Sequence, residues 1–287
     1  MFQTLVQPSE LAAHLEDPDW CVLDCQYSLQ DPQAGYASYL KGHVPGAIYA
    51  NLSTVLSGKP TPSSGRHPLP NSSDLADFLS AAGVNSTVQV IAYDSSNGLF
   101  ASRAWWLLRA MGHSHVAVLD GGLPAWQGAG LPMTDIIKAR EPRHFIGQLQ
   151  PKDSVSTADV TAGLQQRSIK LVDVRAAERF AGTVEPLDPV AGHIPGAISL
   201  PHSESLSADG KFKAPEALRA LFSAQLGPQE PDNIVCMCGS GITACHTLLA
   251  LERAGLTGAR LYAGSWSEWC KDPTRPVGTG QSVPHGS

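Results

Sequence analysis

The sequence has little of what marks a membrane protein or a nucleic-acid-binding protein. No apolar run approaches the roughly 20 residues that span a bilayer. No block of lysine or arginine occurs, and the formal net charge at pH 7 is −6, which argues against a nucleic-acid partner. Residues 1–5 carry neither the basic region nor the apolar core of a secretion signal. We therefore expect a protein that binds neither membranes nor nucleic acids.

Cysteine is also scarce. The six cysteines, at positions 21, 25, 236, 238, 245 and 270, are too sparse in a chain of 287 residues for a disulfide framework. Free thiols are typical of a reducing compartment, so we expect a cytoplasmic protein. Cys236, Cys238, Cys245 and His246 stand close together, but no second well-spaced pair of ligands of the zinc-ribbon kind accompanies them. We expect no metal and no organic cofactor.

What the chain does contain is an internal repeat. The matched segments are 22–24 with 171–173, 42–48 with 192–198, 90–94 with 234–238, and 120–126 with 263–269. The spacing from the first aspartate to the following histidine is 19 residues in one copy (43 − 24) and 20 in the other (193 − 173). Matched segments at matched spacings indicate two copies of one structural unit.

Each copy alternates short apolar strands with amphipathic helices. Strands are expected at 21–24, 88–93, 115–119, 169–174, 197–200, 234–237 and 259–262, and helices at 9–15, 74–82, 100–111, 156–164, 176–180, 215–222 and from 244 towards 255. This order predicts an α/β fold of two tandem domains, each a parallel sheet flanked by helices on both faces. The domains are expected at 1–135 and 154–287, with a proline-containing linker at 136–153. Residues 56–72, rich in Ser, Gly and Pro, are expected to form a surface loop.

The most informative stretch begins at Cys238, directly after the apolar strand at 234–237. The sequence Cys-Gly-Ser-Gly-Ile-Thr-Ala leads from this strand into a helix. Backbone N–H groups of such a turn can converge on an anion, and the helix dipole adds a partial positive charge, so the turn should stabilise the Cys238 thiolate. The first copy has Asp94 at this position, whose carboxylate suits the same turn but is not a thiol. We expect Asp94 to be satisfied by backbone donors and the first copy to be inactive.

The segment from Cys238 to Ala244 resembles the active-site loop of the 3-mercaptopyruvate sulfurtransferases, which have tandem rhodanese-like domains. The resemblance covers nearly the whole chain and implies the same fold. It also implies that Cys238 takes a sulfur atom from a small-molecule donor as a persulfide and passes it to an acceptor. The acceptor would be a thiol, such as thioredoxin or a small thiol, or cyanide. The residues expected to line the substrate site around the sulfur are Gly239, Ser240, Gly241, Ile242 and Thr243.

Two residues outside the loop are also implied by the resemblance. Arg179 matches the arginine that binds the donor carboxylate, although the residues alone favour a surface arginine paired with Glu178 or Glu185. His67 matches a histidine proposed to form a relay with the loop serine and an aspartate. The chain departs from the family at both places.

The departures concern the partners of these two residues. The relay's aspartate position falls at about Ser53, so the relay is incomplete and the role of His67 stays open. A second arginine that often follows the first is absent, and Asp188 stands there instead. Thr243 is expected to cap the helix after the loop rather than to react.

The sequence thus predicts an enzyme that moves sulfur from 3-mercaptopyruvate, releasing pyruvate. The segment Gly239-Ser240-Gly241 contains no cation, which disfavours the dianion thiosulfate as donor. A thiosulfate sulfurtransferase and a non-enzymatic persulfide carrier remain alternatives. A cysteine phosphatase would need an arginine at position 244, where the chain has Ala244.

Overall fold

The computed structural model of the protein describes residues 1–227 and 230–280, which form two compact units. Unit 1 consists of Met1–Lys59, Leu69–Gln150 and Ala208–Phe212. Unit 2 consists of Pro60–Pro68, Pro151–Ser207 and the residues from Lys213 onward. Each unit thus includes one short segment from the other half of the sequence. The predicted domain limits stay a prediction, and residues 281–287 at the end of the second lie outside the described part of the chain.

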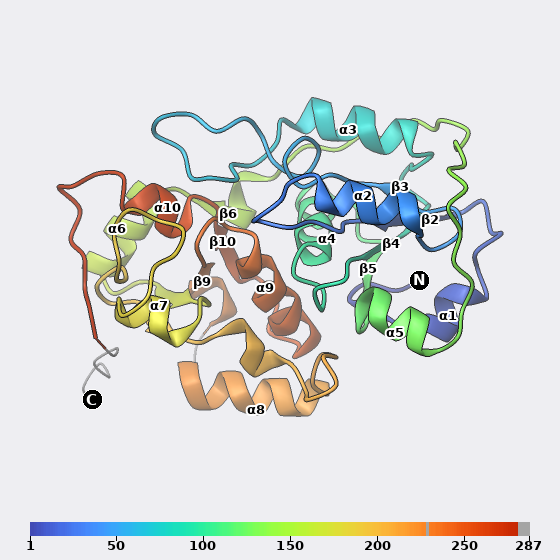
Figure 1. The fold of residues 1–287 in the computed structure, drawn as a ribbon. Coiled ribbons are helices and arrows are strands. Elements are labelled where there is room, and N and C mark those ends of the chain that lie inside the picture. Colours follow the sequence, from blue (N-terminus) through green and yellow to red (C-terminus); the bar gives the residue numbers. More distant parts are fainter. Residues whose placement is uncertain (228–229, 281–287) are drawn as a thin grey trace. The chain divides into compact units, whose positions relative to one another are not determined.

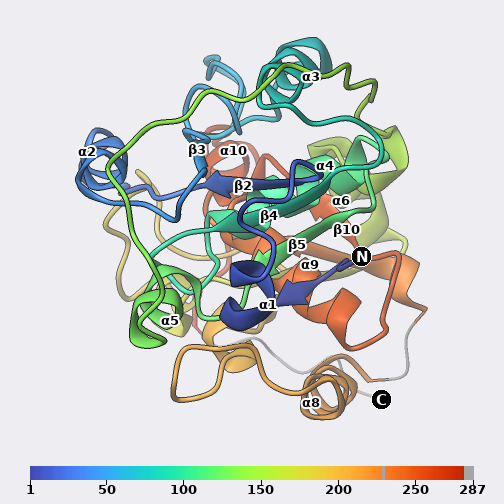
Figure 2. The ribbon, with the colours of Figure 1, turned by 90° about the vertical axis from the view of Figure 1, so that its right-hand side faces the viewer.

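Unit 1 contains a five-stranded parallel sheet with the strand order β1-β5-β4-β2-β3 (Figures 1 and 2). Its strands are β1 (Leu5–Val6), β2 (Trp20–Asp24), β3 (Ile48–Tyr49), β4 (Gln89–Tyr93) and β5 (Val116–Leu119). Its helices are α1 (Pro8–Ala12), α2 (Ala34–Lys41), α3 (Ser72–Ala81), α4 (Ala101–Ala110) and α5 (Gly122–Gly128). Every residue of β2, β4 and β5 is buried, as expected when helices cover both faces of a parallel sheet.

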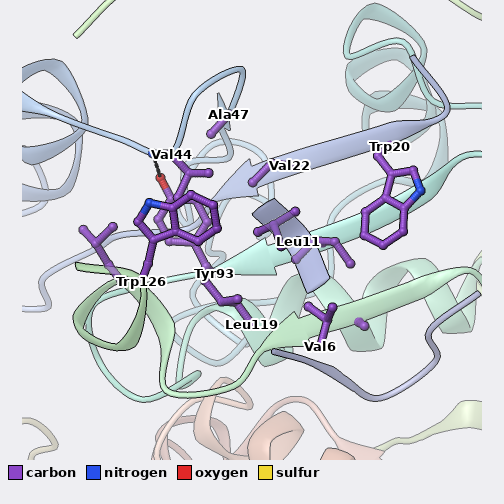
Figure 3. Close-up of a cluster of buried hydrophobic side chains, with 12 residues drawn as sticks. Val6, Leu11, Trp20, Val22, Val44, Ala47, Tyr93, Leu119 and Trp126 are labelled. Atoms are coloured by element: carbon purple, nitrogen blue, oxygen red, sulfur yellow. Dashed lines mark hydrogen bonds between the residues drawn. The ribbon is translucent and has the colours of Figure 1, made fainter. Parts of the chain in front are cut away.

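The side chains of these strands alternate between two helix layers. One set packs against α1 and α5 in the core drawn in Figure 3, whose buried members are Val6, Leu11, Trp20, Val22, Val44, Ala47, Ile91, Tyr93, Ala117, Leu119, Leu123 and Trp126. On the opposite face, the Cys21 sulfur lies 3.5 Å from the carbonyl oxygen of Ala82 at the end of α3, and α4 packs on β4 and β5. Successive side chains of each strand point to opposite faces of the sheet, so they contribute to two separate cores.

Unit 2 repeats this plan with the strand order β6-β10-β9-β7-β8. Its strands are β6 (Ser154–Val155), β7 (Lys170–Asp173), β8 (Ile198–Ser199), β9 (Ile234–Met237) and β10 (Arg260–Tyr262). Its helices are α6 (Thr157–Gln165), α7 (Ala177–Ala181), α8 (Pro215–Leu226), α9 (Thr243–Arg253) and α10 (Ser265–Trp269), with short 3₁₀ turns at Pro151–Asp153, His202–Ser205 and Pro231–Asn233. The equal strand orders confirm the predicted fold class of two tandem α/β domains.

Residues 56–71 form no helix or strand, as the predicted loop at 56–72 requires, but parts of this loop are buried. Residues 59–63 and Asn71 are exposed, whereas Leu56 is 1% exposed and His67 is 9% exposed. In unit 2, the Arg66 N–H donates to Ser267 Oγ at 3.0 Å, and Lys271 Nζ donates to the Ser64 carbonyl oxygen at 2.6 Å. Composition alone could not show this, because the anchoring groups come from the far end of the chain.

The segment predicted as a linker also makes regular contacts. In unit 1, the N–H of Arg143 donates to the Ser80 carbonyl oxygen at 2.9 Å, and the N–H of Phe145 donates to Ser80 Oγ at 3.1 Å. Phe145 itself is buried. Residues up to Gln150 therefore pack as part of unit 1.

Candidate functional site

Cys238 lies directly after β9, where the chain turns into α9. Its N–H donates to Ser265 Oγ at 3.1 Å, and its carbonyl oxygen accepts the N–H of Trp266 at 3.0 Å. The next carbonyl oxygen, that of Gly239, accepts the N–H of Ser267 at 2.9 Å. These bonds fix the turn against the start of α10, at the carboxyl end of a central parallel strand, which is where α/β folds bind ligands.

The glycine at position 241 is required by the shape of the turn. Gly241 has a φ of 77°, and a Cβ there would lie 2.5 Å from the carbonyl oxygen of Ala263. The residue in the N-cap position of α9 is Ile242, with no side-chain capping bond, and Thr243 is the first residue of the helix. The expectation that Thr243 caps α9 is therefore wrong. An uncapped helix start presents N–H groups that an anion can accept.

Unit 1 shows how the same turn of the repeat accommodates an anion. Asp94 follows β4 as Cys238 follows β9, and its carboxylate is fully buried. It accepts four backbone N–H groups at 2.7–2.9 Å, from Ser96, Gly98, Phe100 and Ala101. The expectation that backbone donors satisfy Asp94 is confirmed. Burial raises the pKa of Asp94, and these four N–H bonds oppose that rise.

His67 and Ser240 form a hydrogen-bonded pair within unit 2. His67 Nδ1 lies 2.9 Å from Ser240 Oγ, and the tautomer of the imidazole decides which of the two donates. Both residues are nearly buried, since Ser240 is 6% and His67 is 9% exposed. Ser53, at the relay's aspartate position, belongs to unit 1 and contacts the hydroxyl of Tyr27. The structure thus brings together two of the three predicted relay positions.

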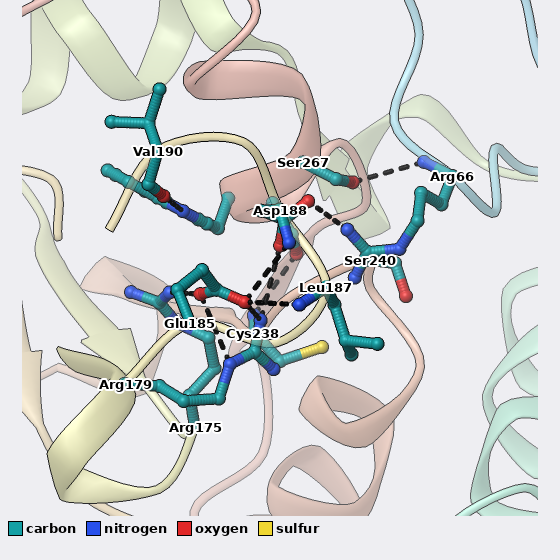
Figure 4. Close-up of polar contacts among 12 residues, drawn as sticks. Arg66, Arg175, Arg179, Glu185, Leu187, Asp188, Val190, Cys238, Ser240 and Ser267 are labelled. Atoms are coloured by element: carbon teal, nitrogen blue, oxygen red, sulfur yellow. Dashed lines mark hydrogen bonds and ion pairs between the residues drawn. The ribbon is translucent and has the colours of Figure 1, made fainter. Parts of the chain in front are cut away.

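Acidic and basic side chains form an alternating chain that runs from β7 to the turn that holds Cys238 (Figure 4). At its buried end, Arg175 Nη2 lies 2.6 Å from Asp173 Oδ2, and Arg175 Nη1 lies 3.3 Å from Glu185 Oε2. The Arg175 guanidinium also stacks over Trp266, 4.9 Å from the ring centroid. The side chain of Arg175 is 1% exposed, so this part of the chain is screened from solvent.

The chain of charges continues through Arg179. Its Nη2 lies 2.7 Å from Glu185 Oε1 and 3.2 Å from Asp188 Oδ2. Arg66 closes the chain by an ion pair from Nη1 to Asp188 Oδ1. Burial alone would raise the pKa of Glu185, but hydrogen bonds from Arg179 and from the N–H groups of Leu187 and Asp188 lower it overall. Burial raises the pKa of Asp188, and the charge of Arg66 is the strongest effect opposing that rise.

The Arg66 side chain reaches the turn that holds Cys238. A Cβ built on Gly239 would lie 3.0 Å from Arg66 Nη2 and 3.3 Å from Arg179 Nη1. Two guanidinium groups therefore lie beside the residue that follows the cysteine. Sequence reasoning missed Arg66, because it lies 122 positions from Asp188 and outside every recognisable motif. The only sequence signal is that Arg66 is next to His67.

Several other features bear on alternative functions. In the described residues, no group of three or more His, Cys, Asp or Glu side chains is arranged to hold a metal ion. All six cysteines are free and buried. A search of the same residues found no helix both long enough and apolar enough to cross a bilayer.

Comparison with known proteins decides the family. A profile of the rhodanese-like domain matches residues 7–129 and again 156–272. The chain belongs to the rhodanese-like family. A Pseudomonas aeruginosa protein named "Probable 3-mercaptopyruvate sulfurtransferase" is 48% identical over 278 residues, covering 96% of this chain and 98% of that protein. The predicted resemblance is confirmed.

Two further rhodanese-like relatives are named after different sulfur donors. A Mycobacterium tuberculosis protein, provisionally named thiosulfate sulfurtransferase SseB, is 40% identical over 291 residues and covers 97% of this chain and 98% of its own. The crystal structure of SseA from Escherichia coli, described as a 3-mercaptopyruvate sulfotransferase with the rhodanese fold, matches with a TM-score of 0.80. SseA is 33% identical to this chain, and the match covers 93% of this chain and all of SseA.

Proposed function

We propose that this protein is a sulfurtransferase that takes sulfur from 3-mercaptopyruvate through a persulfide on Cys238. The observation that carries the proposal is the turn itself: a cysteine at the carboxyl end of a central strand, followed by an uncapped helix start, beside the guanidinium of Arg179. The equivalent turn of unit 1 already holds an anion, the carboxylate of Asp94. The names of the relatives agree with this chemistry.

The proposed reaction has two balanced steps. The Cys238 thiolate attacks the sulfur of mercaptopyruvate, a sulfur–sulfur bond forms, and the carbon–sulfur bond breaks with its electron pair moving onto carbon. The proton from the donor thiol ends on that carbon, which gives pyruvate and leaves the persulfide anion. In the second step an acceptor thiol attacks the outer sulfur and restores the Cys238 thiolate. The N–H groups of the turn from Gly239 to Thr243 would stabilise the persulfide anion.

The Ser240–His67 pair is suited to moving the proton in the first step. The donor thiol must lose a proton, and the carbon that becomes the methyl group of pyruvate must gain one. The Ser240 hydroxyl is hydrogen-bonded to the His67 imidazole at 2.9 Å, and such a pair can pass a proton in either direction. We assign His67 this role through Ser240, without the aspartate that would complete the relay.

The charges of the side chains near Cys238 favour a donor with a single negative charge that lies away from its sulfur atom. Three arginines and three carboxylates make up the alternating chain, so its formal charge is balanced. The ends of Arg66 and Arg179 lie beside Gly239, one residue from the cysteine, which suits a carboxylate more than a dianion placed on the sulfur itself. We expect kcat/KM for mercaptopyruvate to exceed that for thiosulfate at least about tenfold, or roughly 1.4 kcal/mol.

Thiosulfate is the second candidate donor. Arg66 adds a cation that the loop sequence lacks, and one relative bears the name of a thiosulfate sulfurtransferase. For the acceptor we propose a thiol, either a small thiol or a protein such as thioredoxin, or cyanide. The six free cysteines support a reducing compartment such as the cytoplasm.

The test combines mass spectrometry with steady-state kinetics. Incubation with mercaptopyruvate should add one sulfur atom to the peptide that contains Cys238, and Cys238→Ser should abolish both this adduct and turnover while the fold is kept. Label on Cys236 or Cys245 instead would refute the assignment of the nucleophile. If the protein turns over thiosulfate faster than mercaptopyruvate at equal concentration, thiosulfate is the preferred donor and the assignment of mercaptopyruvate is wrong.

A further inference from the structure

Two guanidinium groups that come from distant parts of the sequence converge on one point beside Cys238. Arg66 belongs to the segment 60–68, and Arg179 belongs to α7, both within unit 2. Arg66 Nη2 lies 3.0 Å, and Arg179 Nη1 lies 3.3 Å, from the position that a Cβ on Gly239 would occupy. Because position 239 is glycine, no side chain there keeps the two guanidinium groups away from the turn.

Each guanidinium is anchored on its far side. Arg66 is paired through Nη1 with Asp188, and Arg179 is paired through Nε and Nη2 with Glu185 and through Nη2 with Asp188. Within the described residues, Arg66 Nη2 and Arg179 Nη1 have no protein acceptor. An arginine has five N–H donors, so anchoring from behind still leaves donors that face the ligand.

We infer that Arg66 and Arg179 together bind the carboxylate of the sulfur donor above Gly239, and that Asp188 is a positioning residue that holds Arg66 there. This inference rests on the proposed function and adds to it the identity of the second cation. Two planar guanidinium groups can each donate to one carboxylate oxygen, which fixes the position of the donor relative to the cysteine.

Asp188 supports this role through its own surroundings. Its side chain is 3% exposed, and its two oxygens are divided between Arg66 and Arg179. The N–H of Asp188 in turn donates to Glu185 Oε1 at 3.2 Å, which ties the backbone to the same network. A carboxylate between two guanidinium groups offsets their mutual repulsion, so both cations can lie close to one ligand.

The test uses alkylation of Cys238, which does not depend on which donor the enzyme turns over. Iodoacetate and iodoacetamide react alike, with the thiolate displacing iodide from carbon, but only iodoacetate has a carboxylate next to the reacting carbon. The rate ratio of iodoacetate to iodoacetamide therefore reports carboxylate binding near the sulfur. In Arg66→Met the ratio should fall about tenfold or more, because a charge-assisted contact is lost. The matched control Arg219→Met, on an exposed position of α8, should leave it unchanged.

The charge-swapped variant Arg66→Asp with Asp188→Arg keeps the ion pair and moves the cation to the other segment. It should restore the ratio to within about threefold of the unmodified protein, whereas Arg66→Met with Asp188→Asn should not. An unchanged ratio in Arg66→Met, or an equal fall in both alkylation rates, would overturn the role of Arg66 in binding. A low ratio in the charge-swapped variant would overturn the positioning role of Asp188.

Kinetics with mercaptopyruvate separate this inference from the proposed function. Arg66→Met should raise KM about tenfold or more and leave kcat within about threefold, since the carboxylate contact exists before and during the reaction. If the unmodified protein does not turn over mercaptopyruvate, the proposed donor fails, while the alkylation ratio still decides whether Arg66 binds carboxylates.

Discussion

Replacing Arg175 by glutamine should destabilise unit 2 by about 2–4 kcal/mol. Arg175 is 1% exposed in its side chain, and its partners Asp173 and Glu185 are 0% and 4% exposed. Removing one partner of a buried ion pair costs about 3–5 kcal/mol, because the remaining charge is left uncompensated. Glutamine keeps part of the bonding, since in unit 1 Gln26 binds Asp24 through its backbone N–H at 2.9 Å and its side-chain amide at 3.0 Å.

The retained bonds are fewer in unit 2 than in unit 1. Asp24 also accepts a hydrogen bond from the Tyr93 hydroxyl, whereas the equivalent residue of unit 2 is Met237. The variant would in addition leave Glu185 with one arginine partner fewer and would remove the guanidinium from Trp266. These losses keep the expected effect well above that of a surface substitution.

Hydrogen exchange in increasing urea, followed by mass spectrometry of peptides from β7 and β9, measures this effect. A local readout is needed because the two units need not unfold together. Arg219→Gln, exposed on α8, is the control and should change the free energy of unfolding by no more than about 0.5 kcal/mol. A loss below about 1 kcal/mol for Arg175→Gln would refute the reasoning, since the buried ion pairs would then contribute no more than exposed ones.

Three further expectations follow from the turns and the charge network. Gly241→Ala combines a φ of 77° with a Cβ 2.5 Å from a backbone oxygen, so thermal unfolding should show a loss of about 2 kcal/mol or more together with loss of persulfide formation. Asp94→Ala leaves four N–H groups without their acceptor and should destabilise unit 1 by about 3 kcal/mol, measured by exchange in β4; a neutral effect would mean that water replaces the carboxylate. Because the pKa of Glu185 is lowered, its contribution to stability is present above the usual value of 4.5 and is lost as the pH falls through the folded-state pKa. The Tm difference between the unmodified protein and Glu185→Gln should thus be largest near neutral pH and shrink below about pH 4.5, and a difference that grows on acidification would contradict the assignment.

The repeat made most of the fold predictable. Matched spacings around Asp24 and Asp173 imply two copies of one unit, and alternation of strands and helices implies parallel sheets. The two-residue strands β1, β3 and β6 and the helix α2 carry too little periodicity to be recognised from the sequence. Their positions are decided by pairing with neighbouring strands, for example Leu5 with Val118.

The candidate site was predictable where its residues are consecutive. The turn from Cys238 to Thr243 could be interpreted from local chemistry, because strand, glycines and helix follow one another in the chain. Arg66 could not be found in this way, since its approach to Gly239 depends on the segment 60–68 packing against Ser267 and Lys271. The cap of α9 was assigned wrongly because threonine is a good N-cap residue in general, whereas here the turn ends one residue earlier, at Ile242.

The carboxylate of Asp94 has a consequence for which residues position 94 can tolerate. In this turn the anion is part of the chain itself, so the four hydrogen bonds from the backbone are a permanent part of the structure. Because four backbone donors bind that carboxylate, replacing it by the thiol of cysteine should remove stability from unit 1. Position 94 is therefore constrained by the folding of unit 1, independently of any reaction.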